Sequence, residues 1–231
     1  MFSLGSYAQV EIPSLTSPVI DQAGMLTSEF SQRLRGILYQ LKNEKGTQVV
    51  VLTIPSLDGE SIEGFSIRVV DQWKLGSEKK DDGVLLLISR GDRKLRIEVG
   101  QGLEGILTDL KSKRIIDYDI TPFFKAGDIE GGVLNGVLSI IKTVQPDYHP
   151  GIRAPQPRKR RSRGGIFSHL FVLILIFFLL FTRLGRTILY MRGGSHRGRF
   201  GGGGGFGGGF GGGGFGGGGG GFSGGGASGG W

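Results

Sequence analysis

The sequence predicts an α/β domain with a mixed sheet sandwiched by helices over residues 9–147, then one transmembrane helix and a disordered tail. Three observations lead to this fold class. Segments with helical apolar spacing alternate with short β-branched or apolar runs throughout residues 9–147. Residues 170–181 are twelve apolar residues without interruption. Residues 201–231 contain 23 glycines and cannot bury enough surface to offset their backbone entropy.

The first half of the domain is predicted to run helix, strand, helix. Thr27 or Ser28 can cap a helix whose apolar residues recur every three or four positions until Gly46 ends it. Residues 48–54 (QVVVLTI) are β-branched and lack polar alternation, which predicts a central strand covered on both faces. Residues 61–75 return to helical spacing, so we expect a second amphipathic helix there.

The second half is predicted to begin with a β-hairpin. Residues 83–89 (GVLLLIS) form another buried strand, and a tight connection leads into residues 94–99 (KLRIEV). The second strand alternates cleanly, so its apolar residues should face inward and Arg96 and Glu98 outward. Helical spacing then returns from Thr108 to Val144, with Leu110 and Tyr118 among the apolar positions and Pro122 and Gly127 dividing it into two helices.

Charge and hydropathy divide the chain near residue 148. All 20 acidic residues lie in 1–147 with 17 lysines and arginines (17 − 20 = −3), whereas residues 148–231 carry 11 basic residues and no acid. The 19 residues between Arg163 and Arg183 are uncharged, and a helix of that length would reach about 28 Å, close to the thickness of a bilayer core. We therefore expect a Pro/Arg-rich linker at 148–165 and a transmembrane helix at 166–190.

The two ends of the chain bear on localisation. Residues 1–8 (MFSLGSYA) resemble the end of a signal peptide, with small residues placed as at a cleavage site. We expect a remnant of such a signal, and hence a domain outside the cytoplasm (periplasmic or extracellular) and a cytoplasmic, disordered Gly/Phe-rich tail at 191–231. Six basic residues precede the span (153–163) and five follow it (183–199), so the flanking charges do not settle orientation.

Several blocks carry a family resemblance. They read VIDQAGML (19–26), DDGVLLLI (81–88), RIEVGQGLEGILTD (96–109) and FKAGD (124–128), followed by a pair of glycines. Across residues 12–145 the chain resembles the TPM-domain family, also called the TPM-phosphatase family. The resemblance implies a small α/β/α sandwich. It also implies either of two activities: plant relatives are described as thylakoid-lumen acid phosphatases, and some bacterial relatives bind calcium through an acidic cluster.

Acidic residues gather around the predicted hairpin. Antiparallel pairing should bring Glu98 beside Asp82, and the following loop should add further carboxylates at the same edge of the sheet. Oxygen ligands without histidine or cysteine suit a hard cation, so we expect Ca²⁺ or Mg²⁺ here. The alternative assigns the same residues to turns, helix caps and solvated strand positions. The predicted ligands are Asp21, Asp81, Asp82, Glu98, Glu104 and Asp109.

Two functions follow from these features. The first is a non-catalytic module that binds cations and a partner beside the bilayer, for which a membrane protein is one candidate. The second is a metal-assisted phosphatase acting on phosphomonoesters, with Asp81 and Asp82 as candidate catalytic residues and Asp21 assisting. The domain contains neither cysteine nor histidine, which excludes thiolate and histidine-based catalysis within it. Arg-Gly pairs near residue 192 resemble an RNA-binding segment, but we do not expect nucleic acid as a partner.

The glycines at 100, 102 and 105 match G-x-G-x-x-G after a strand. No parallel strand follows them, so a dinucleotide site is not predicted. We expect these glycines to adopt positive φ in a turn that brings backbone close to the acidic residues.

Overall fold

The computed structural model describes residues 9–150 and 215–231. The predicted signal remnant (1–8), the transmembrane helix (166–190), nearly all of the linker and the first part of the tail lie outside these residues. Within the described ranges, no helix combines the length and the apolar character that crossing a membrane requires.

The sheet has five strands in the order β1-β2-β3-β4-β5. The first three strands are parallel, whereas β4 is antiparallel to both β3 and β5. The mixed sheet and the β3–β4 hairpin confirm the predictions, and neither β1 nor β5 was predicted. The strands are β1 (Val19–Asp21), β2 (Gln48–Ile54), β3 (Gly83–Ser89), β4 (Lys94–Gly100) and β5 (Phe222–Gly230).

The helices lie close to their predicted positions. In the first, the Thr27 hydroxyl accepts a hydrogen bond from the Phe30 N–H, and Gly46 ends the helix at φ 83°. The segment predicted to hold two helices instead holds two short helices and a π-helical stretch before the last long helix. The elements are α1 (Ser28–Lys45), α2 (Ile62–Trp73), the 3₁₀ turn η1 (Gln101–Leu103), α3 (Asp109–Arg114), the π-helical η2 (Ile115–Ile120), α4 (Thr121–Lys125) and α5 (Ile129–Val144).

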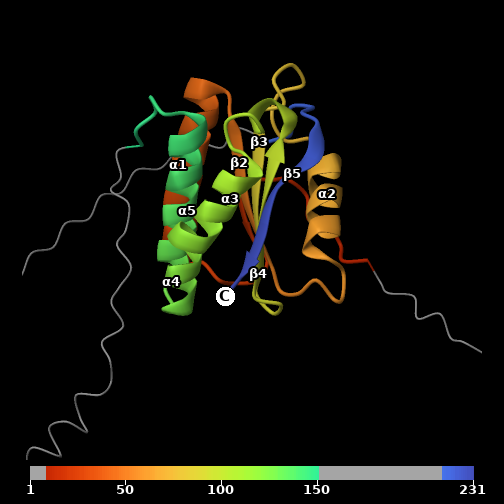
Figure 1. Ribbon diagram of the computed structural model, residues 1–231, viewed down its shortest axis with the longest axis vertical. Helices are drawn as coiled ribbons and strands as arrows, with labels where there is room; N and C mark the ends of the chain where they lie inside the picture. Colours follow the sequence, from red (N-terminus) through yellow and green to blue (C-terminus); the bar gives the residue numbers. More distant parts are fainter. Residues whose placement is uncertain (1–8, 151–214) are drawn as a thin grey trace, which may run out of the picture. The chain divides into compact units, whose positions relative to one another are not determined.

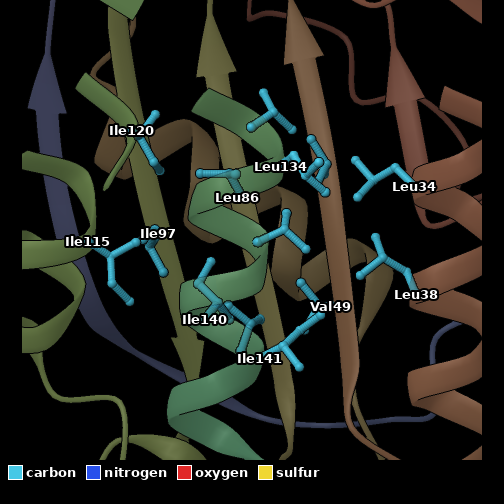
Figure 2. Packing of buried hydrophobic residues seen from close by; sticks show 14 of the residues in the cluster. Leu34, Leu38, Val49, Leu86, Ile97, Ile115, Ile120, Leu134, Ile140 and Ile141 are labelled. Carbon is cyan, nitrogen blue, oxygen red and sulfur yellow. The ribbon is translucent and has the colours of Figure 1, made fainter. Parts of the chain in front are cut away.

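Helices cover both faces of the sheet (Figure 1). On one face α1, α5 and η2 pack against alternate residues of the strands, including Val49, Leu86 and Ile97 (Figure 2). On the other face α2 packs against the intervening residues Leu85 and Leu87. Every residue of β2 and β3 is therefore buried, as the uninterrupted apolar runs predicted.

Two predictions about side-chain direction are wrong. Leu110 and Tyr118 are 63% and 74% exposed, whereas Ile115, Ile116 and Ile120 are buried. Tyr118 lies in the π-helical stretch, which departs from the helical period that predicted its burial. Arg96 and Glu98 do lie on the face opposite Ile97, but that face is covered. Their exposures are only 6% and 0%.

Truncating the centre of the sheet should be far more damaging than truncating the α3 surface. We expect Leu86→Ala, which empties a fully buried site on β3, to lower the free energy of unfolding by about 2–5 kcal/mol. Leu110→Ala is the matched control, and its effect should stay within about 0.5 kcal/mol because the side chain is exposed. Urea denaturation followed by circular dichroism measures both, and equal losses would contradict the packing described here.

Candidate functional site

The C-terminal segment, residues 215–231, folds onto the domain as part of the same compact unit (Figure 1, blue). It first passes the α2–β3 connection, where the Glu78 N–H donates to the Gly218 carbonyl and the Gly219 N–H donates to the Lys74 carbonyl, both at 3.0 Å. It then forms β5, which pairs with β4 along its whole length from Lys94 to Gly100. For these residues the prediction of a disordered tail is wrong. The reason is that the backbone of β4 supplies hydrogen-bond partners that an isolated glycine tract lacks.

Two aromatic residues anchor the segment at its ends. Phe215 is 4% exposed, and its ring meets Tyr39 edge-on with the ring centroids 5.1 Å apart. The Lys42 ammonium lies 4.5 Å from the centre of the same ring, a cation–π arrangement, and burial lowers the pKa of that lysine. At the other end Trp231 meets Phe124 edge-on, with centroids 4.8 Å apart.

Four carboxylates accept hydrogen bonds from the segment. Asp81 accepts from the Gly221 N–H at 2.5 Å, and Asp109 accepts from the Gly226 N–H at 2.8 Å. Glu104 accepts from the Ser223 hydroxyl, and Glu63 accepts from the Ser228 hydroxyl at 2.5 Å. Hydrogen bonds to ionised acceptors are stronger than neutral ones, so these carboxylates select a strand rich in free N–H and O–H donors.

The bond from Ser228 also affects the ionisation of Glu63. It lowers the pKa of the carboxyl below the ordinary value, partly opposed by desolvation and aided more weakly by the positive charges of Arg96 and Lys94. The docked segment therefore favours the ionised form of Glu63.

A buried ion pair lies beneath β5. The Arg96 Nε is 2.6 Å from the Glu98 carboxylate and also donates to the Ser66 hydroxyl at 3.0 Å. The two terminal nitrogens of Arg96 donate to the segment, one to the Ser228 hydroxyl at 3.0 Å and the other to the Gly224 carbonyl at 3.1 Å. Arg96 thus links the buried carboxylate to the strand above it, and its terminal nitrogens depend on that strand for these bonds.

Glycine is required where the segment approaches the domain most closely. A Cβ on Gly226 would lie well inside van der Waals contact of the Ile97 carbonyl oxygen, and its φ of 134° is unfavourable for other residues. A Cβ on Gly220 would collide with the Leu75 carbonyl oxygen. Gly216, in contrast, has open space around it. Close backbone approach, rather than flexibility alone, explains glycine at the first two positions.

The predicted ligands do not converge on one point. Asp21 accepts from the Met25 and Leu26 N–H groups and from the Thr53 hydroxyl, near the end of β2. Asp82 accepts from the backbone and hydroxyl of Ser77 and lies near Gln48 at the start of β2. Five residue steps of about 3.3 Å separate these two ends of the strand, roughly 16 Å.

The other predicted ligands are likewise engaged. Glu98 pairs with Arg96 and lies opposite Leu85 rather than beside Asp82, while Asp81, Glu104 and Asp109 accept from the C-terminal segment. One Glu98 oxygen, Oε1, is buried without a hydrogen-bond partner. Across the described parts of the chain, no three acidic or histidine side chains are grouped so as to hold a metal ion. In this arrangement the six predicted ligands do not form one cluster.

The glycines of the G-x-G-x-x-G match behave partly as predicted. Cβ atoms on Gly100 and Gly102 would collide with the carbonyl oxygens of Asp81 and Lys80, so close backbone approach is confirmed. Positive φ is not confirmed, since Gly100 has φ −68°. Sequence reasoning missed Glu63, Ser66 and the role of Arg96. The signal that could have indicated these contacts is the pair Ser223 and Ser228, two hydroxyl donors within the final glycine tract.

Comparison with known proteins supports the motif-based expectation. The TPM domain family model matches residues 19–143, more than half of the chain. The solution NMR structure of the N-terminal domain of a protein from P. gingivalis is 31% identical, with a TM-score of 0.52, covering 59% of this chain and 89% of that one. The N-terminal domain of the cg2496 protein from Corynebacterium glutamicum is 15% identical, with a TM-score of 0.42, covering 67% of this chain and 97% of that one. No curated protein matches the chain. This chain belongs to the TPM domain family.

Proposed function

We propose that the domain is a non-catalytic strand-binding module of a membrane-anchored protein, and that its ligand is the glycine- and serine-rich segment at residues 215–231. The observation that carries this proposal is the pairing of β4 with β5 from Lys94 to Gly100, which is in register as far as Val99 and shifts at a bulge between Val99 and Gly100. Binding an extended peptide at a sheet edge is a recurrent recognition mode, in which main-chain hydrogen bonds supply affinity and side-chain contacts supply specificity. The apolar segment at 166–182 supports the membrane anchor.

Specificity of the module rests on three kinds of contact. The carboxylates require N–H and hydroxyl donors, and Arg96 requires hydroxyl and carbonyl acceptors in the same strand. The close approach at Gly226 excludes side chains, and at the two ends Phe215 contacts Tyr39 and Trp231 contacts Phe124. The matching ligand is therefore an extended peptide with small residues at its centre and aromatic residues at its ends.

A metal-assisted phosphatase is the other activity that family resemblance implies. Among the described residues, Asp81 and Asp82 both accept structural hydrogen bonds, from Gly221 and from Ser77. No observation on these residues favours phosphoryl transfer over strand binding, so we propose the binding module as the function.

Gly226 provides the direct test of strand binding. The chain has no cysteine, so Lys94→Cys and Gly230→Cys, which face one another across β4 and β5, create a pair that cross-links only when the segment is docked. Gly226→Ala should reduce the rate of this disulfide roughly ten-fold or more, because strained backbone of this kind costs about 1–3 kcal/mol. The reduction is measured in the full-length chain by gel shift after mild oxidation.

Gly216→Ala is the matched control, because open space surrounds that residue, and it should leave the rate unchanged. A second control, Lys94→Cys with Gly216→Cys, joins positions at opposite ends of the segment and should not cross-link. Efficient cross-linking in the Gly226→Ala chain would refute the close backbone approach described at Gly226.

Docking should also weaken in acid. The Ser228 bond lowers the pKa of Glu63 in the docked state. Its contribution to the stability of docking is therefore fully present above the ordinary pKa of 4.5 and is lost as the pH falls through the lower pKa of the docked state. Fluorine NMR of fluorotryptophan-labelled protein can follow Trp231, assigned by Trp231→Phe, since the chain has only one other tryptophan. Glu63→Gln should flatten the response below pH 4.5, whereas Asp71→Asn on the exposed surface of α2 should retain it.

We also propose that the carboxylates at this edge bind a cation when the C-terminal segment is not docked. Asp81, Glu104 and Asp109 are engaged by the stretch from Gly221 to Gly226, so a cation and the segment would compete for them. A chain ending at residue 214 should then gain more thermal stability from millimolar Ca²⁺ than the full-length chain, up to about 2.7 kcal/mol at 100 times the Kd. Equal gains would contradict competition, and no gain in either chain would remove the cation proposal.

A further inference from the structure

The position of β5 constrains how the chain meets a membrane. The domain at residues 9–150 and the segment at 215–231 belong to one compact unit. Between them in the sequence lies the apolar stretch 166–182, which alone would be predicted to carry the chain once across a bilayer. A single crossing would place the domain and the segment on opposite sides.

A bilayer between β4 and β5 is incompatible with their pairing. Paired strands lie about 4.8 Å apart, whereas the hydrocarbon core of a bilayer is about 30 Å thick. Docking between copies does not remove the conflict, because copies inserted in the same orientation would all present their domains on one side and their C-terminal segments on the other. The pairing of Lys94 through Gly100 with β5 therefore requires both partners in one compartment.

We infer that residues 215–231 lie on the same side of the membrane as the domain. This inference rests on the proposed strand binding and replaces the expectation of a cytoplasmic tail beside an extracytoplasmic domain. The docking is too specific for an incidental contact, since four carboxylates and the buried Arg96 all have partners in the segment.

The flanking charges agree with this arrangement. Six basic residues precede the apolar stretch (153–163) and five follow it (183–199), with no acid in either flank. A chain that crosses once usually has more basic residues on its cytoplasmic side. The near-tie of six against five lacks this asymmetry and is therefore compatible with a domain and a C-terminal segment on one side of the membrane.

Single-cysteine labelling of the full-length chain tests the inference. Gln32→Cys places a thiol on the exposed surface of α1, and Gly216→Cys places one in the C-terminal segment, at a position exposed even when the segment is docked. Each variant is expressed in cells, and a membrane-impermeant maleimide is added before or after permeabilisation. We expect both thiols to react under the same condition. Reaction of one thiol without permeabilisation and of the other only after it would overturn the inference.

A second measurement separates this inference from the proposed function. A synthetic peptide of residues 215–231 is added to detergent-solubilised chain ending at residue 214, and binding is followed by peptide fluorescence anisotropy. Opposite-side labelling together with peptide binding would overturn the shared compartment and leave strand binding intact. Same-side labelling, with cross-linking of Lys94→Cys to Gly230→Cys in the membrane, supports both.

Discussion

The outer edge of β4 is the constraint on which the arrangement of the domain depends. A strand at the edge of a sheet exposes a row of N–H and C=O groups that can pair with any extended chain. Natural proteins usually prevent such unwanted pairing by covering or interrupting the edge. Here β5 occupies that edge from Lys94 to Gly100. Phe215 and Phe222 of the same segment pack with α2 on one face of the sheet. The pairing therefore protects the sheet, and it marks the place at which we propose that a peptide is recognised.

Arg96 shows how this recognition is tied to the core. Its guanidinium joins the buried Glu98 on one side and the C-terminal segment on the other, so the polar groups beneath the strand and the strand itself satisfy each other. A buried charge that loses its partner is strongly destabilising. Departure of β5 would leave the terminal nitrogens of Arg96 in need of water or another peptide, which makes this arginine sensitive to what occupies the groove.

Much of the fold could be predicted because its signals are local. The cap at Thr27, the stop at Gly46 and the apolar runs of β2 and β3 each act over a few residues, and the structure has them where expected. The candidate site could be predicted only in part. Asp81, Glu104 and Asp109 do lie at one edge, but their partners are N–H and hydroxyl groups more than a hundred residues away.

The sequence by itself determined the three long helices α1, α2 and α5, the central strands, the hairpin and the family. Only the tertiary structure decided that Phe222–Gly230 is a strand, that Arg96 and Glu98 are buried, and that the predicted ligands serve separate roles. The physical reason is that glycine has no local preference for a strand. Its extended conformation here comes from hydrogen bonds to β4 and from contacts such as Trp231 with Phe124, which no local pattern encodes.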